Sequence, residues 1–385
     1  MKAKILLLLL LQLASSQWML LDQDSPPLLT TDASAKPNMS ESSPMWSNGR
    51  NLYLLNDQMW KYEINEKRWL WQCPTGITER KYAAYWTMRG IFYLFSGLSD
   101  GGIVSNDMWT YDPKSRAVQP IGGNMPTARY GATFWTHEQS NRLYLFGGLS
   151  GNTTLSDLYA FDVISRTWSQ VSYTGSPDLL PFASATLFGS SNVYLYSNDR
   201  LWRLDLSTNI WSQVTVNGGI NPPGPVRMHH ILWSDGTFLF LYGGESGSKL
   251  FGDLWQCAID STSGACTWTH LTEKILPPAR SSPSYTVDIY GSLFINSGGD
   301  AEYNDLWGYG QISELSLLEK LENGLQSSIL WAFTAAVLAG LVLLLLIGVL
   351  LYVCILRCIS AKKNHGHTPL IMTRIGKNGE EFVNL

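Results

Sequence analysis

Residues 143–159 read LYLFGGLSGNTTLSDLY: an apolar strand, a pair of glycines, and an aspartate shortly before an aromatic residue. An apolar strand followed by an aspartate and an aromatic recurs six times, 43 to 53 residues apart. The six aromatic residues are Trp60, Trp109, Tyr159, Trp202, Trp255 and Trp307. Regular self-similarity at this period indicates that one structural unit is repeated along the chain.

Other features accompany the aromatic residue in several copies. A second tryptophan lies nine residues downstream, at Trp69, Trp168 and Trp211. Upstream, an arginine precedes a tryptophan by six residues, in the pairs Arg80 and Trp86, Arg129 and Trp135, and Arg227 and Trp233. Each copy therefore holds about four short strands separated by Gly, Pro and Asn, which predicts a four-stranded antiparallel sheet.

These motifs resemble the kelch repeat of β-propellers, in which paired glycines precede a Tyr or Trp and a further Trp closes the blade. The resemblance covers residues 17–310 and implies an all-β, six-bladed propeller. Two copies lack the glycine pair, near Leu55 and Ser197, and Ser96 replaces the first glycine of the second copy. Val118 stands where the second copy would have its closing Trp. We interpret the repeated aromatics as core residues of the blades.

The sixth copy lacks its last strand, because no closing tryptophan follows Trp307. The missing strand has a counterpart near the start of the chain: residues 17–21 (QWMLL), followed by Pro26-Pro27, match residues 267–271 (TWTHL), followed by Pro277-Pro278. We therefore predict that residues 17–22 form the outer strand of the last blade. This strand would close the ring and cover edges that would otherwise stay unpaired.

Both ends of the chain predict a secretory membrane protein. Residues 1–16 combine Lys2 and Lys4 with an apolar run and small residues at the end, which is typical of a cleaved signal peptide. Residues 329–356 contain no formal charge and are long enough to span a bilayer as a helix. Basic residues follow this segment, which places residues 357–385 in the cytosol. The sequence thus predicts a type I single-pass protein with a stalk at residues 311–328.

The span and the tail contain three candidate interaction motifs. Ala332, Ala336 and Gly340 form a stripe of small residues that would allow a homodimer through the membrane helix. Cys354 and Cys358 lie at the cytosolic boundary, where S-palmitoylation is common. The C-terminal residues 382–385 (FVNL) fit strand addition to a PDZ-type adaptor.

We label the four strands of a blade a to d, from the axis of the propeller to its rim. Because the strands alternate in direction, the loops between strands b and c share one face with those that connect strand d to the next strand a. Four arginines precede an innermost strand on this face, Arg80, Arg129, Arg227 and Arg280. In kelch propellers, arginines at similar positions line a pocket for acidic peptides, so these four are candidate ligand-binding residues. The alternative is that each one hydrogen-bonds carbonyl groups of the neighbouring blade. The sequons at Asn38 and Asn152 are candidate glycosylation sites on the same face.

The cysteines predict one disulfide and leave one thiol. Cys257 and Cys266 flank a short insertion in the fifth copy, and we expect them to form a disulfide in an oxidising compartment. Cys73 is left over, either as a buried thiol or for pairing between molecules. No metal or cofactor site is indicated, because adjacent residues such as His229 and His230 point to opposite faces of a strand.

The net charge of −4 says little about partners. No basic stripe suggests nucleic-acid binding, and the predicted secretory route argues against it. No catalytic constellation is evident, so we expect a non-enzymatic module that binds a protein or glycan ligand through its outward face. Two alternatives remain at this level: a membrane-tethered propeller oxidase or hydrolase, and a cargo receptor of the early secretory pathway. The ligand itself is not encoded in a recognisable motif.

Overall fold

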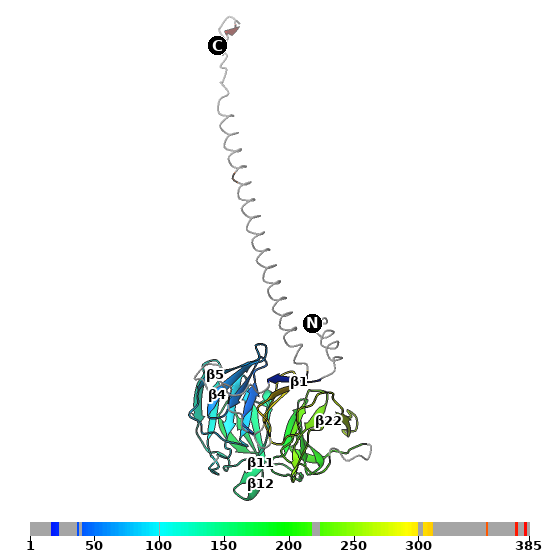
Figure 1. The fold of residues 1–385 in the computed structure, drawn as a ribbon. Helices are drawn as coiled ribbons and strands as arrows, with labels where there is room; N and C mark the ends of the chain where they lie inside the picture. Colours follow the sequence, from blue (N-terminus) through cyan, green and yellow to red (C-terminus); the bar gives the residue numbers. More distant parts are fainter. Residues whose placement is uncertain are drawn as a thin grey trace. The chain divides into compact units, whose positions relative to one another are not determined.

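The computed structural model describes residues 17–22, 37, 41–99, 101–217, 224–298, 303–310, 352, 374–375 and 381–382. The chain forms two units, Met1–Ser313 and Glu314–Leu385. In the second unit, the described strands are β27 (Arg374–Ile375) and β28 (Glu381–Phe382), which pair antiparallel. The first unit is an all-β propeller, and the only described helix in it is a single 3-10 turn, η1 (Glu138–Ser140) (Figure 1).

Blades 1 to 3 are four-stranded antiparallel sheets that follow the order of the sequence from the inner to the outer strand. Blade 1 consists of β2 (Met45–Ser47), β3 (Asn51–Leu55), β4 (Gln58–Glu63) and β5 (Arg68–Pro74). Blade 2 consists of β6 (Ala84–Met88), β7 (Ile91–Phe95), β8 (Met108–Asp112) and β9 (Ala117–Ile121). Blade 3 consists of β10 (Thr133–His137), β11 (Arg142–Ser150), β12 (Thr153–Asp162) and β13 (Thr167–Gln170).

Blades 4 to 6 repeat this arrangement, with two variations. Blade 4 consists of β14 (Ser184–Phe188), β15 (Asn192–Ser197), β16 (Arg200–Asp205) and β17 (Ile210–Gln213). Blade 5 consists of β18 (Ile231–Ser234), β19 (Leu239–Tyr242), β22 (Leu254–Ile259) and β23 (Cys266–Leu271), with the hairpin β20 (Glu245–Ser246) and β21 (Lys249–Leu250) inserted. Blade 6 consists of β24 (Ser284–Val287), β25 (Leu293–Asn296), β26 (Leu306–Gly310) and, from the start of the chain, β1 (Gln17–Asp22).

The predicted closing strand is confirmed. β1 pairs antiparallel with β26, with Trp18 opposite Tyr309 and Leu20 opposite Trp307. The Trp18 ring packs 5.0 Å from Tyr242 of blade 5, and the Leu21 carbonyl accepts a 3.0 Å hydrogen bond from the Tyr62 hydroxyl of blade 1. The N-terminal strand thus contacts the blades on both sides of the one it completes.

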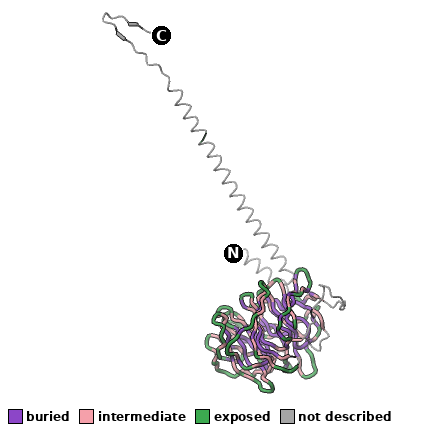
Figure 2. The backbone as a smooth tube through the Cα atoms, turned by 90° about the vertical axis from the view of Figure 1, so that its left-hand side faces the viewer, coloured by how far each residue is buried: buried purple, intermediate pink, exposed green. Residues whose placement is uncertain are grey.

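The core consists of six apolar clusters, and each cluster lies between two adjacent blades. Buried residues gather inside the propeller, and exposed residues lie at its periphery, in loops and on outer strands such as β13 (Figure 2). In the cluster between blades 6 and 1, Leu21, Phe294 and Leu306 pack against Leu52 and Trp69. Because this interface joins the last blade to the first, the apolar core runs around the whole ring.

The structure joins Cys257 to Cys266 in a disulfide across β22 and β23. Cys73, at the outer strand of blade 1, is a free and partly buried thiol, and burial raises its pKa. Of the two alternatives for this cysteine, its partial burial against blade 2 favours a packed thiol.

Several predicted segments lie outside the described residues: the signal peptide (1–16), Asn38, the stalk (311–328), Cys354 and Cys358, the span (329–356, apart from Tyr352) and most of the tail. Across the described part of the chain, no helix has the length and apolar character needed to cross a bilayer. The membrane topology therefore stays a prediction.

The closing strand generates a stability prediction. Replacing Trp18, which is 4% exposed, with Ala removes a buried indole between blades 5 and 6 and should lower the free energy of unfolding by about 3–5 kcal/mol. Trp71, which is 51% exposed, is the matched control, and Trp71→Ala should cost less than about 1 kcal/mol. Urea denaturation of the full chain measures both changes. Equal effects of the two substitutions, or unchanged cooperative unfolding after deletion of residues 17–22, would contradict ring closure through β1.

Candidate functional site

Six residues with positive φ surround one end of the central channel, on the face of the b–c loops and the d–a connections. Each lies two or three residues before the innermost strand of its blade, and together they form what we call the collar. Its members are Ser42, Tyr82, Gly131, Phe182, His229 and Ser282, with φ between 49° and 63°. Left-handed backbone is uncommon for residues other than glycine and marks positions worth examining for function.

Backbone hydrogen bonds connect the collar from blade to blade. The amide of Gly131 donates to the Tyr82 carbonyl at 3.0 Å, and the amide of Phe182 donates to the Gly131 carbonyl at 2.9 Å. The series continues around the ring: the amide of His229 donates to the Phe182 carbonyl at 3.3 Å, and the amide of Ser282 donates to the His229 carbonyl at 3.0 Å. The amide of Ser42 donates to the Ser282 carbonyl at 2.9 Å. The left-handed conformation thus satisfies buried polar backbone groups at the centre of the ring.

Three aromatic side chains of the collar pack together over the channel. The ring of Phe182 stacks on His229 at 4.1 Å between centroids, and Tyr82 lies 5.0 Å from Phe182 and 5.5 Å from His229. Gly131 makes room for this cluster, since a Cβ atom there would lie 2.5 Å from the Phe182 ring. The collar is therefore apolar at its centre.

His229 is held as a neutral imidazole in this cluster. Its Nδ1 lies 2.6 Å from the Ser282 hydroxyl, and its Nε2 lies 3.6 Å from a carboxylate oxygen of Glu245. Burial lowers the pKa of His229 to about 4, and burial together with the Arg227 charge lowers the pKa of His230 to about 3. Neither histidine adds positive charge to the channel mouth near neutral pH.

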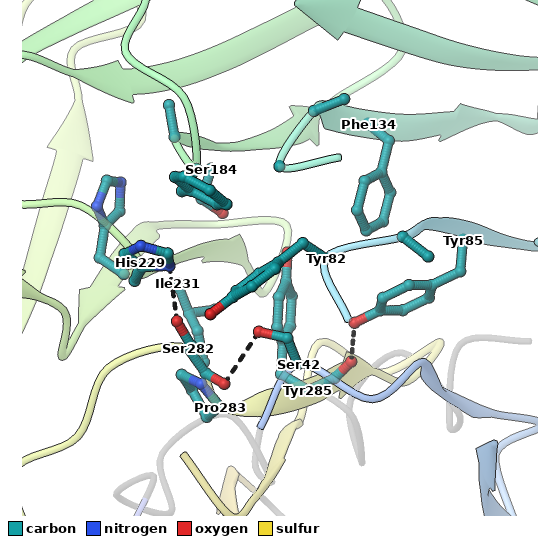
Figure 3. A pocket seen from close by; sticks show the side chains of 16 residues that line it. Ser42, Tyr82, Tyr85, Phe134, Ser184, His229, Ile231, Ser282, Pro283 and Tyr285 are labelled. Carbon is teal, nitrogen blue, oxygen red and sulfur yellow. Dashed lines mark hydrogen bonds between the residues drawn. The ribbon is translucent and has the colours of Figure 1, made fainter. Parts of the chain in front are cut away.

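A small hollow of about 90 Å³ lies within the collar. Figure 3 shows Tyr82, His229 and Ser282 turned toward one another, with Tyr85 and Phe134 on the other side of Tyr82. The Tyr85 hydroxyl donates a 2.7 Å hydrogen bond to the Tyr285 carbonyl, and its ring lies 4.8 Å from Phe134. This hollow is too small for more than one inserted side chain, so binding at the collar must rely on the surface around it.

That surface is most apolar over blade 5. Val226, Met228 and Leu250 are exposed, and we call them the blade-5 lip. Met228 pairs with Glu245, and Glu245 pairs with Leu250, so these segments lie side by side next to His229. Ile103 and Ile275 are exposed in other loops of the same face. An exposed apolar lip beside an aromatic cluster is typical of a protein-binding surface.

The four predicted ligand-binding arginines are buried beneath this face, with at most 4% of each residue exposed. Each guanidinium forms a bidentate ion pair with an aspartate of its own blade. The pairs are Arg80 with Asp107, Arg129 with Asp157, Arg227 with Asp253, and Arg280 with Asp305. The hydrogen bonds from Nη1 and Nη2 of Arg280 to the two carboxylate oxygens of Asp305 measure 2.8 and 2.9 Å, which is the geometry of a strong charge-assisted pair.

The same guanidinium groups donate to a backbone carbonyl at the end of strand b. Arg129 bonds the Gly147 carbonyl at 3.0 Å, Arg227 the Gly243 carbonyl at 3.0 Å, and Arg280 the Ser297 carbonyl at 2.8 Å. These carbonyls belong to the arginine's own blade, whereas the alternative in the sequence analysis placed them in the neighbouring blade. None of the four arginines lines the hollow in the collar. An anionic ligand would have to compete with the aspartates, and ligand binding by these arginines stays a prediction.

The aspartates explain the recurring motif of an aspartate before an aromatic. In three blades the second carboxylate oxygen also accepts the indole N–H of the tryptophan two residues later, at 2.6–2.7 Å from Trp109, Trp255 and Trp307. Burial alone would raise the pKa of Asp107 and Asp253, but the hydrogen bonds from the arginine and the tryptophan outweigh it and lower the pKa. In blade 3 the aromatic is Tyr159, and the Arg129 guanidinium lies 5.7 Å from its ring.

Blades 1 and 4, on opposite sides of the ring, differ from the other four. They have no glycine at the end of strand b, and the two-residue turns Asn56-Asp57 and Asn198-Asp199 follow directly. In blade 3, by contrast, strands b and c continue past the glycine pair before the two-residue turn Gly151-Asn152. In blade 4, Arg200 stands two residues before the aromatic, where blades 2, 3, 5 and 6 have an aspartate, and it forms an exposed ion pair with Asp178 at 3.1 Å. On this face, the b–c connections therefore project least from the sheets over blades 1 and 4.

One of the two candidate glycosylation sites, Asn152, lies within the described residues. Asn152 is exposed in the turn between β11 and β12, where a glycan can be attached. Over the described ranges, no group of three His, Cys, Asp or Glu side chains is placed to hold a metal ion.

Sequence reasoning missed the collar and the aspartate partners. A signal for both is present: each arginine is followed two residues later by a collar residue and 25 to 28 residues later by its aspartate. The second glycine of the doublet belongs to the same pattern, since a Cβ at Gly148 would lie 2.9 Å from the Tyr130 carbonyl just before the collar. What the spacing did not reveal is which of these side chains face one another.

Comparison with known proteins identifies similar chains. The family model for the KLHDC2/KLHL20/DRC7 Kelch-repeats domain matches residues 8–196 and 117–299. Kelch domain-containing protein 10 of Xenopus tropicalis is 23% identical over 270 residues, which cover 64% of this chain and 63% of that protein. Kelch domain-containing protein 1 of Mus musculus is 26% identical over 246 residues (53% of this chain, 59% of that protein). Tip elongation aberrant protein 1 of Schizosaccharomyces pombe is 24% identical over 266 residues (57% and 22%). The chain thus spans less than two thirds of the length of each of these relatives.

The ion pairs generate a stability prediction. Arg129→Ala leaves Asp157 without its partner in a partly buried site and should lower the free energy of unfolding by about 3–5 kcal/mol. Arg200→Ala removes an exposed pair and should cost less than about 1 kcal/mol. Urea denaturation of the full-length variants gives both values. If Arg129→Ala proves as mild as Arg200→Ala, the buried pairs do not hold the loops of this face in place.

Proposed function

The chain belongs to the kelch-repeat family, and we propose that its propeller is a protein-binding module displayed on the lumenal or extracellular side of a membrane. Kelch propellers generally act as protein-interaction scaffolds, which supports a binding role without a reaction. A fold alone does not specify a function, so the proposal depends on the site.

The observation on which the proposal rests is the apolar surface at the channel mouth. The Phe182–His229 stack and Tyr82 are joined there by the exposed blade-5 lip, Val226, Met228 and Leu250. Aromatic and methionine side chains are enriched at the centres of protein interfaces, and a few such residues supply most of the binding free energy. The ligand would place an apolar anchor on the lip and meet Glu245 and Lys249 at its edge.

The rigidity of the loops favours this face as well. The arginine–aspartate pairs anchor the b–c connections of blades 2, 3 and 5 to the segments that precede their inner strands. Loops held in one conformation lose little entropy on binding, so they can recognise a ligand at a lower cost. The low turns of blades 1 and 4 leave room between these loops for an extended segment of a partner.

The proposed topology is supported by chemistry within the propeller. A disulfide between Cys257 and Cys266 fits an oxidising compartment, and the exposed sequon at Asn152 is accessible for glycosylation there. Together with the signal-like residues 1–16 and the uncharged segment 329–356, these features favour a type I single-pass protein at the cell surface or in the secretory pathway.

The binding face can be tested in cells that express the full-length chain with a proximity-labelling enzyme fused to it. Met228→Asp with Leu250→Asp places charges on the blade-5 lip and should reduce labelling of the partner by about tenfold or more. Ile164→Asp is the control, because Ile164 is also an exposed apolar residue but lies in the turn between β12 and β13 on the opposite face. If the lip variant and the control label the same proteins equally, the ligand does not bind at the lip.

The topology is tested by glycan removal. Wild-type protein from cells should shift in electrophoretic mobility after treatment with an N-glycosidase, and Asn152→Gln should remove the part of the shift that this sequon contributes. Asn38→Gln serves as the second sequon variant, and the double variant should show no shift. A wild-type chain that is insensitive to the glycosidase would contradict a lumenal propeller.

A further inference from the structure

The central channel has a second and larger hollow at its other end, on the face of the a–b and c–d turns. Its volume is about 550 Å³, which is within the usual range for a small-molecule site. Tyr85, Phe134 and Tyr285 line both hollows, so these three rings form the partition between them. The second hollow is therefore a separate pocket, on the face opposite the collar.

The lining of this pocket combines an apolar floor with hydroxyl groups. Met45, Ala185 and Leu232 join the partition rings at the floor, and Thr87, Thr136, Thr186 and Thr286 lie along the inner strands. Its rim carries His137, Glu138 and Asp288, and no lysine or arginine is among the residues that line it. The pocket thus offers apolar contact, hydroxyl groups and negative charge to a ligand.

The fold does not explain why the whole carboxylate group of Asp288, which lines this pocket, is buried. It is 7% exposed, and its Oδ1 accepts hydrogen bonds from the amides of Tyr290 and Ser292, both at 2.9 Å. Its Oδ2 is buried and has no hydrogen-bond partner among the described residues. Burial raises the pKa of Asp288 to about 6, which reflects a carboxylate without a compensating positive charge.

The equivalent turn of blade 5 shows that the turn itself does not require this arrangement. There Asp235 caps the turn in the same way, and its Oδ1 accepts the amides of Thr237 and Phe238 at 2.8 Å. Asp235 is exposed and does not line the pocket. A turn needs one carboxylate oxygen, so burying the second oxygen of Asp288 costs free energy that the turn does not recover.

We propose that this pocket binds an organic ammonium ligand, whose charged nitrogen pairs with the Asp288 carboxylate while its apolar body rests on Leu232, Phe134 and Ala185. A charge-assisted bond to the ligand would compensate the buried carboxylate. The terminal torsion of an aspartate is broad, so the carboxylate can turn toward the ligand while it still caps the turn. The ammonium can come from a free amine or from a lysine side chain of a peptide. The pocket lies on the other side of the partition rings from the collar, and this proposal is independent of the proposed function.

Calorimetric titration of the full-length chain tests the pocket, with benzylamine as the free amine and an acetylated, amidated peptide with one lysine as the second probe. At least one probe should bind saturably, and benzyl alcohol, which has the same ring without the charge, should bind at least about tenfold more weakly. Binding of the amine alone or of the peptide alone identifies the source of the ammonium. No saturable binding of either probe would overturn the proposal.

Two variants locate the site. Asp288→Asn keeps an oxygen for the turn and removes the charge, so it should weaken binding by about tenfold or more, whereas Asp235→Asn should leave affinity unchanged within about twofold. Ala185→Phe fills the floor of the pocket and should abolish binding while Asp288 stays in place. Thermal unfolding of each variant verifies that it is folded. Equal binding by wild type and a folded Asp288→Asn variant would overturn the assignment to Asp288.

Discussion

The buried bidentate pair between an arginine and an aspartate is the interaction on which the binding face depends. The arginine lies in the segment that enters the inner strand, and the aspartate lies where the b–c loop returns to strand c. One guanidinium therefore fixes two connections that are 25 to 28 residues apart. In three of the four blades the aspartate also holds the tryptophan of the next strand, which joins this polar network to the apolar core.

Ring closure is the second constraint, and it follows from how the core is distributed. Each blade buries its faces only against its two neighbours, so a ring with an incomplete blade would expose apolar surface and a strand edge. β1 removes both defects, with Trp18 packed toward blade 5 and Leu21 toward blade 1. The rings of Tyr85, Phe134 and Tyr285 separate the two ends of the channel, with an aromatic collar at one end and an open pocket at the other.

The candidate site shows which inferences a sequence can support. The arginines were identified as important from their spacing, but they were assigned to the channel mouth, whereas they lie beneath it in ion pairs. The residues that do surround the mouth, such as Tyr82 and His229, share no residue type, because Ser, Gly and Phe take the same place in other blades. Only their position two residues after an arginine recurs, in four of the blades. Asp288 is equally inconspicuous in the sequence, since Asp235 caps the equivalent turn of blade 5 without being buried.

Periodicity and local spacing are enough to predict the number of blades, the closing strand and the Cys257–Cys266 pair. The folded chain was needed to show that the arginines face aspartates of their own blades, that the collar residues turn over the channel, and that one carboxylate is buried at the far end. The physical reason is that side-chain direction at the ends of strands is set by single left-handed residues and by packing between blades. The position of the left-handed residue recurs, but its residue type changes from blade to blade, so the sequence does not show which side chains face one another.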